Sequence, residues 1–508
     1  MAAILAPERV VRASGRRLGP VVDAHAHFFN ASDVPVRGFL EECLGHKAAP
    51  AARLLLKALA RLADRLSEGA PTAAKELEDL TELIAKTDRA ATAADVVRAQ
   101  VDLERQLTAQ RVTDAIRGSD FERLYRQMKQ GGPGPAGQGR TGPISPDEVL
   151  DLVRAAERPL PQRGQPAAAA EAQTADSEAA DGILGFLNYM LSYRWVNLQS
   201  YMKAFTIEPD AFGVDAVLGA LVDFDYWLDC PPRSAHDDQV RLHQRLHELH
   251  NRAASDSSAK PYFYPLVAYN PWTDINQDGA GLARVINACT QGSFIGVKIY
   301  PPTGFRPAGN AAIPATTKKA RPELKKLDAT LKTFFAKCAE LRIPILAHSA
   351  HSNGRDDAHD EFGGPAGWEA LLRMSAQEAR TPIVNFGHFG GGQGSTWTEE
   401  FARLVSTHPG AALYADLGYW EELMCPAPVD SLCTTARARL RSAVSPAIDG
   451  TSETVVDRTM FATDWLMLSQ VKRWAQYPAQ LYESLLTIMS EGDAMKVFGG
   501  NAVKCFRL

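Results

Sequence analysis

Two histidines, His25 and His27, stand one residue apart at the end of a short apolar run, residues 21–27. Successive side chains of a β-strand point to opposite faces, so residues two apart share a face. If this run is a strand, both imidazoles project on the same side and can hold one side of a metal ion. Taken alone, the pair more often marks an ordinary polar strand end, because His-x-His also occurs by chance.

Four more residues with metal-binding or acid–base chemistry follow later apolar runs in the same way: Lys298, His348, His388 and Asp464. Exposure to solvent at the end of a strand would explain any one of these residues. It does not explain why all of them lie at the same position relative to an apolar run. Imidazole and carboxylate suit Zn²⁺ and also accept Mn, Fe or Co. Three or four such ligands around an open position lower the pKa of a bound water to about 7. The set therefore predicts a divalent-metal site that activates water, with Zn as the best-suited ion.

The elements that must position these residues are short apolar runs that alternate with amphipathic helical stretches. Besides the opening run, we expect strands at 215–225, 261–271, 294–302, 343–350, 382–388, 411–418 and 459–465. Eight strand–helix repeats predict a closed (β/α)8 TIM barrel, in which chemistry lies at the carboxyl ends of the strands. No Gly-x-Gly-x-x-Gly follows the first strand, which argues against a dinucleotide-binding sheet.

Between the first and second strands the sequence predicts a long, mainly helical insertion. Residues 31–205 are rich in Ala, Leu, Glu, Lys and Arg at helical spacing. Gly/Pro/Ala-rich stretches at 129–148 and 163–182 are expected to be flexible linkers, and 183–205 to be one packed helix. The expected organisation is thus residues 1–30 with the first strand, the insertion at 31–205, and the rest of the barrel at 206–508.

The composition restricts the partners and the compartment of the protein. The 508 residues carry a net charge of -5 with scattered basic residues, which gives no footprint for nucleic acid. No stretch reaches the roughly 18 apolar residues of a membrane span. Seven cysteines lie far apart without a CxxC pair and are expected to be reduced thiols, which is typical of a cytoplasmic protein.

An ordered set of motifs resembles the metal-dependent amidohydrolase superfamily, and most closely its amidohydrolase-2 group. The motifs are DAHAHFF, GVKIYPPTGF, ILAHSA, NFGHFGGG, FATDW and the ending VFGGNAVKCFRL. The resemblance covers residues 20–30 and about 205–508. It implies one metal held by His25, His27, His348 and Asp464, with His388 polarising the substrate. Asp464 would also act as the general base.

The resemblance does not decide whether the site holds one metal ion or two, because the answer depends on whether Lys298 is modified. In two-metal branches of the superfamily a strand-4 lysine is carbamylated and bridges two ions. Lys298 would then join the first metal, and the second would take Lys298, His348 and His388. One ion is favoured, because the overall resemblance is to the mononuclear group. An unmodified Lys298 would instead hold a substrate carboxylate or oxyanion.

Residues just past the strand ends are candidates for contact with a small-molecule substrate: Lys298, Tyr300, Arg306, His351 and Trp465. Asp223 or Asp225 is expected to orient a ligand histidine.

The function expected from these observations is metal-dependent hydrolysis of a C–N or C–O bond in an amide, cyclic amide or lactone-like small molecule. One alternative is non-oxidative decarboxylation of a small aromatic or enol acid with the same ligands. A second is a non-catalytic scaffold that binds a protein through the insertion. The insertion can cap the pocket, pack against a second copy in a homo-oligomer, or do both.

Overall fold

The computed structural model describes most of the chain. The described residues are 19–44, 50–87, 93–130, 142–157, 175–205, 213–228, 231–255, 262–313, 321–351, 354–377, 381–391, 396–425 and 429–508.

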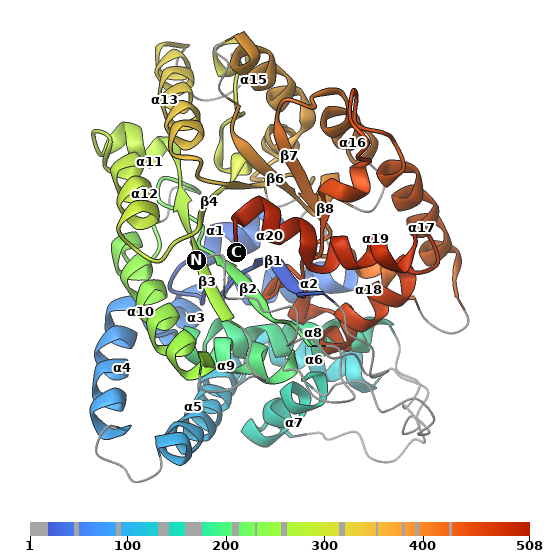
Figure 1. The fold of residues 1–508 in the computed structure, drawn as a ribbon. Helices are drawn as coiled ribbons and strands as arrows, with labels where there is room; N and C mark the ends of the chain where they lie inside the picture. The colour runs from blue at the N-terminus through green and yellow to red at the C-terminus, as the bar shows by residue number, and fades with distance from the viewer. Residues whose placement is uncertain are drawn as a thin grey trace.

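The core of the protein is a (β/α)8 barrel, as predicted (Figure 1). Its strands are β1 (Val22–Ala26), β2 (Ala216–Ala220), β3 (Tyr262–Tyr269), β4 (Gly296–Ile299), β5 (Ile345–His348), β6 (Ile383–Gly387), β7 (Ala412–Asp416) and β8 (Thr459–Met460). Each strand pairs in parallel with the next along the chain. Backbone hydrogen bonds from Ala24 to Phe461 (3.0 Å) and from Asp464 to His25 (2.7 Å) join the ends of the sheet. The sheet therefore curls into a barrel, which brings Asp464 beside His25.

Helices cover the outside of the barrel, and one closes its floor. The covering helices are α10 (His236–Ser255), α11 (Pro271–Asn276), α12 (Ala280–Thr290), α13 (Arg321–Leu341), α14 (Asp357–Asp360), α15 (Pro365–Gln377), α16 (Trp397–Thr407), α17 (Ser431–Val444), α18 (Tyr477–Leu485) and α19 (Glu491–Met495). The last helix, α20 (Asn501–Phe506), lies across one end of the barrel in Figure 1. Its Cys505 and Phe506 pack against Val22, Leu218 and Leu346 of the barrel interior. This end is filled with apolar side chains, so chemistry is left to the opposite mouth.

A β-bulge in β1 turns the two sequence-predicted histidines toward the interior. Val22 and Ala24 belong to the cluster inside the barrel, whereas Ala26 and Phe28 belong to the core outside it. The pairing register with β2 shifts between Asp23 and Ala26. A bulge adds one residue and so exchanges the faces of the residues that follow it.

The chain between β1 and β2 is helical, as predicted. Its helices are α1 (Val36–Gly38), α2 (Pro50–Ala60), α3 (Ala63–Gly69), α4 (Ala73–Thr87), α5 (Ala93–Ile116), α6 (Asp120–Gln130), α7 (Pro146–Ala156), α8 (Ala175–Met190) and α9 (Arg194–Ala204). In Figure 1 helices α4 to α9 lie together on one side of the barrel.

Two details of the expected insertion are wrong. The second expected linker, 163–182, overlaps α8, because the Ala-rich residues from 175 onward favour a helix. The single helix expected at 183–205 is two helices, and the chain breaks at 191–193 so that Tyr193 is extended before α9. Residues 131–141 of the first linker and 163–174 of the second lie outside the described residues.

A fully buried ion cluster ties the insertion together and to the barrel. Arg194 at the start of α9 donates through Nε to Asp33 (2.7 Å) and through Nη1 to Glu76 (2.9 Å). Glu76 also accepts hydrogen bonds from the backbone N–H groups of Arg194 and Trp195, which caps α9. Arg194 Nη2 reaches the hydroxyl of Ser234, just before α10. The cluster therefore joins the segment after β1, helices α4 and α9, and the segment that leads into α10.

The expectation of reduced thiols is wrong at one pair. Cys425 and Cys433, eight positions apart in sequence, form a disulfide across the start of α17. Spacing alone does not reveal that these two side chains meet. The other described cysteines, Cys43, Cys289, Cys338 and Cys505, are free thiols.

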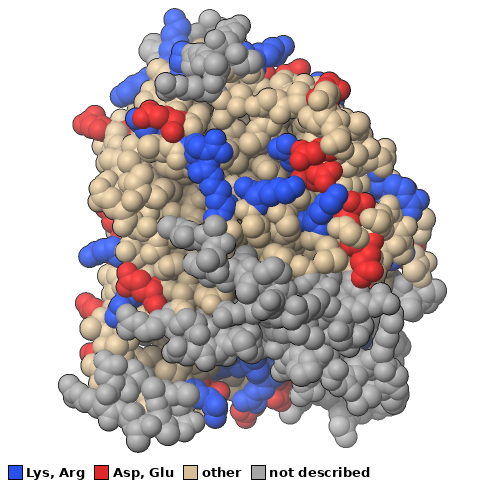
Figure 2. Space-filling model, viewed as in Figure 1, with Lys and Arg blue, Asp and Glu red and all other residues tan. Residues whose placement is uncertain are grey.

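On the surface, basic and acidic side chains are interspersed over the described part of the face shown in Figure 2. Within the described residues, no helix combines the length and the apolar character that crossing a membrane requires.

Candidate metal and active site

All six predicted residues lie at or just past the carboxyl ends of their strands. His25 and Lys298 are the penultimate residues of β1 and β4, His27 follows β1, and His348 is the last residue of β5. His388 follows β6, and Asp464 follows β8. All six are buried; the most exposed, His388, is 7% exposed. The fold thus brings together residues that are up to 439 positions apart in sequence.

Three histidines are held by their Nδ1 atoms, so that Nε2 points into the site. The Nδ1–H of His27 donates to the carbonyl of Ala220 (2.8 Å), and that of His388 donates to the carbonyl of Gly418 (3.0 Å). The Nδ1 of His25 lies 3.3 Å from a carboxylate oxygen of Asp416. A partner on Nδ1 fixes the tautomer and leaves the Nε2 lone pair available, as is usual for metal-binding histidines.

The free nitrogens and one carboxylate converge at the mouth of the barrel. His25 Nε2 and His27 Nε2 are 3.1 Å apart, and they lie 3.6 and 3.4 Å from Asp464 Oδ1. One ligand atom each from His25, His388 and Asp464 lies within 4.8 Å of the others. Two lone pairs this close in a buried site repel each other unless a cation or proton lies between them. The donor set therefore fits a divalent cation such as Zn²⁺.

Lys298 provides a positive charge inside the same cluster. Its Nζ donates to His25 Nε2 over 2.8 Å. Burial lowers the pKa of Lys298 to about 8, although Asp464 and Asp416 act in the opposite direction. The pKa of Asp464 is raised well above its usual range because the carboxyl is buried, and Lys298 offsets part of this effect.

His348 and His388 form a pair beside the other ligands. His348 Nδ1 lies 3.1 Å from His388 Nε2. Burial lowers the pKa of His388 to about 4 and that of His348 well below its usual range. Burial, with Lys298 next, also lowers the pKa values of His25 and His27. All four imidazoles are therefore neutral near pH 7, which is the form that binds metals.

The carboxylate that orients these residues is Asp416, which the sequence analysis did not identify. Asp416 ends β7 and is fully buried. It accepts from the side-chain amide of Asn385 (2.7 Å) and the backbone N–H of His388 (3.0 Å), and it lies against His25. The signal was present in the sequence, because Asp416 lies near the carboxyl end of a predicted strand, residues 411–418, as the other site residues lie near the ends of theirs. Asp223 and Asp225, expected in this role, instead accept hydrogen bonds at their backbone carbonyls from the side-chain amide of Asn270.

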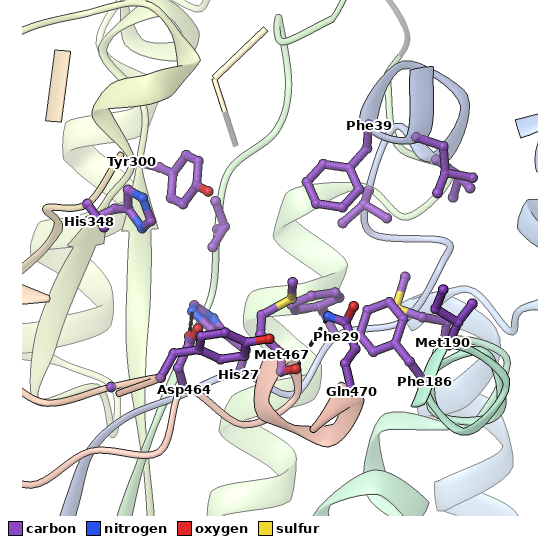
Figure 3. A pocket seen from close by; sticks show the side chains of 18 of the residues that line it. His27, Phe29, Phe39, Phe186, Met190, Tyr300, His348, Asp464, Met467 and Gln470 are labelled. Carbon is purple, nitrogen blue, oxygen red and sulfur yellow. Dashed lines mark hydrogen bonds and ion pairs between the residues drawn. The ribbon is translucent and has the colours of Figure 1, made fainter. Parts of the chain in front are cut away.

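The cluster opens into a cavity of about 630 Å³. Figure 3 shows His27, His348 and Asp464 at one end of this cavity and Phe39, Phe186 and Met190 at the other. The polar end comes from the barrel strands, and the apolar end comes from the insertion. The insertion therefore caps the mouth at which the ligands meet.

The residues expected to contact substrate separate into two groups. Tyr300 and His351 line the cavity, and the Tyr300 ring lies 4.6 Å from that of His348. Arg306 and Trp465 are not among the residues that line it. Arg306 stacks on Phe362, and Trp465 is buried among aromatic rings that include Tyr189 and Trp474. Lys298 lies beneath the cavity against His25.

A parallel eight-stranded barrel with a histidine–aspartate cluster at its carboxyl mouth defines the class of (β/α)8-barrel enzymes. The sequence model of the amidohydrolase family matches residues 222–508, which is more than half of the chain. The protein belongs to the amidohydrolase family and is an enzyme of amidohydrolase type, which confirms the resemblance. The family generally binds a divalent metal. His25 and His27 precede the matched residues.

Solved structures with similar folds show low identity to the chain. A probable 2-pyrone-4,6-dicarboxylic acid hydrolase from Acinetobacter baumannii is 10% identical, with 58% of this chain and 84% of that chain covered and a TM-score of 0.36. An uncharacterised TIM-barrel protein from Bordetella bronchiseptica is 15% identical (71% and 90% covered, TM-score 0.36). An amidohydrolase from Burkholderia multivorans with bound zinc is 12% identical (58% and 84% covered, TM-score 0.33). The comparison with curated proteins gives no match.

Proposed function

We propose that the protein is a metal-dependent hydrolase that cleaves a C–N or C–O bond of a small amide, cyclic amide or lactone-like molecule. The observation that carries this proposal is the convergence of the His25 and His27 Nε2 atoms with the Asp464 carboxylate at the mouth of the barrel. In the proposal, one Zn²⁺ is held by His25, His27, His348 and Asp464. When bound, the ion supplies a Lewis acid and a water that is acidic enough to react near neutral pH.

The residues of the chain then perform the proton transfer and hold the substrate. The Asp464 carboxylate takes the proton from the attacking water and passes it to the leaving nitrogen or oxygen. Its raised pKa supports this role, because a carboxyl that holds a proton more tightly is a better base and acid near neutral pH. His388, which lines the cavity beside His348, faces the substrate oxygen on which negative charge develops. An unmodified Lys298 lies behind it against His25 and contributes positive charge to the site.

The cavity lining favours an uncharged substrate group in the outer part of the cavity. In the described part of the chain the lining includes Glu421, Glu422 and Asp464 but no lysine or arginine. A substrate carboxylate in the outer cavity would meet like charges without a nearby counter-ion. A neutral amide or lactone meets no such cost.

Removal of the metal should abolish hydrolysis reversibly. After treatment with dipicolinate, the rate with p-nitrophenyl butyrate is expected to fall by about 100-fold or more, and Zn²⁺, Mn²⁺ or Co²⁺ to restore it. His25→Ala should show the same residual rate with and without added zinc, because it lacks a ligand. Full activity after complete metal removal would contradict the proposal. Release of carbon dioxide from small aromatic acids, without ester or anilide cleavage, would favour decarboxylation.

A further inference from the structure

We propose that the apolar end of the cavity is an acyl-binding chamber, and that the substrate carries an extended uncharged hydrocarbon group which the insertion encloses. This inference rests on the proposed function and names the substrate class for it. The chamber is defined here as the part of the cavity lined by Phe39, Leu59, Leu66, Phe186, Leu187 and Met190.

The chamber is built by the insertion rather than by the barrel. Ile183, Phe186, Leu187 and Met190 of α8 all line the cavity, and their spacing of three, four and seven residues places them on one helix face. The opposite walls come from α2 and α3 and from the turn that contains Phe39. These walls are largely shielded from solvent: Leu59, Leu66 and Leu187 are 2, 2 and 5% exposed.

The chemistry of the lining selects an apolar occupant. Figure 3 shows the side chains of Phe29 and Met467 between the metal ligands and the far wall, with Gln470 as a polar group among them. Gln470 donates its amide to the carbonyl of Met467 (3.3 Å). An apolar group that enters such a space leaves water without giving up hydrogen bonds, whereas a charged group would be desolvated.

The size and direction of the cavity set the position of the scissile bond. A volume of about 630 Å³ lies in the range that holds drug-sized ligands, roughly 300–1,000 Å³. The reacting carbonyl belongs at the end where His27, His348 and Asp464 meet. The hydrocarbon group then extends from it toward Phe186 and Met190 under the cap.

The test measures how binding and turnover depend on chain length. Zinc-loaded enzyme is assayed with p-nitrophenyl esters from acetate to decanoate, and binding of the alkanols from butanol to decanol is followed by calorimetry with and without zinc. We expect kcat/KM and alkanol affinity to rise about fourfold per methylene until the chamber is filled. Alkanol binding should not require zinc, because it uses only the chamber.

Two leucines of α8 provide matched variants. Leu187→Ala enlarges the chamber and should move the preferred chain to a longer one, while Leu187→Trp should move it to a shorter one. Leu184 is buried in the same helix but does not line the cavity, so Leu184→Ala should leave the chain-length profile unchanged. If Leu187→Trp does not fold, the comparison of the two alanine variants is sufficient.

The outcomes separate this inference from the proposed reaction. Alkanol affinity that does not depend on chain length, or a profile that shifts equally in the Leu187→Ala and Leu184→Ala variants, would overturn the chamber even if esters are cleaved. Affinity that rises with chain length and responds only at Leu187 supports the chamber. If no ester or anilide is then turned over, the chamber stands and the proposed hydrolysis fails.

Discussion

Asp464→Asn is expected to lower kcat by about a thousandfold or more, in the range of losses seen when a general base is removed. The amide keeps the shape of the side chain but cannot take the proton from water. It is also a weaker partner for a cation beside His25 and His27. Steady-state assays with p-nitrophenyl butyrate, together with metal analysis of the purified variant, measure the two effects separately.

Asp223→Asn is the matched control for this substitution. Asp223 is also a buried aspartate that follows a barrel strand, but it does not line the cavity. Burial raises its pKa to about 7, so near neutral pH the native carboxyl already holds a proton for much of the time. Asp223→Asn should therefore keep activity within a few-fold of the native enzyme. Equal losses in the two variants would show that Asp464 acts through folding rather than chemistry.

Arg194→Met is expected to lower the free energy of unfolding by about 3–5 kcal/mol, the cost of breaking a buried ion pair from one side. The substitution leaves Asp33 and Glu76 buried without their cation. Burial already raises the pKa of Glu76, and Arg194 is the largest influence that offsets this. Urea denaturation measures the loss, and Arg194→Lys should lose less because it keeps the charge but not the forked geometry.

Arg37→Met is the control for the ion-pair prediction. Arg37 pairs with Asp64 in the same insertion, but its side chain is 54% exposed, and exposed pairs contribute little. We expect the Arg37→Met variant to have nearly the same urea midpoint as the native protein. A loss in Arg194→Met as small as that in Arg37→Met would mean that the buried cluster does not hold the insertion on the barrel.

Much of the barrel could be predicted because its strands are short apolar runs that end in polar residues. The predicted run 215–225 contains β2, but the strand ends at Ala220, and the residues that follow bring Val222 and Phe224 to the cavity wall. Hydropathy does not distinguish a strand from an extended segment that is buried in the same core. The runs were therefore found correctly but were assigned too many residues.

The candidate site could be predicted only for residues whose side-chain direction is set by the end of a strand. His25, His27, His348, His388 and Asp464 share a rim because parallel strands deliver their carboxyl ends to the same mouth. For residues that lie beyond the end of a strand, the direction of the side chain depends on tertiary packing. Trp465 turns into an aromatic core beside Tyr189, and Arg306 lies over Phe362. The role of Asp416 depends on its distance to His25, which no sequence pattern gives.

The chamber could not be predicted because its walls come from helices whose apolar faces look alike in sequence. Leu184 and Leu187 have the same side chain and lie one turn apart in α8, yet only Leu187 lines the cavity. The break before Arg194 was also missed, because it depends on Glu76, more than a hundred residues away, which caps the new helix.

The claim that one metal ion is bound at the mouth of the barrel is tested most directly by anomalous diffraction at the zinc edge, from crystals of the zinc-loaded protein. The account predicts one strong peak within coordination distance, about 2.0–2.2 Å, of His25 Nε2, His27 Nε2, a His348 nitrogen and Asp464, with Lys298 unmodified. Two peaks bridged by a carbamylated Lys298 would contradict the single-ion site. No peak at the mouth of the barrel, in protein that binds zinc elsewhere or not at all, would contradict the metal-dependent mechanism itself.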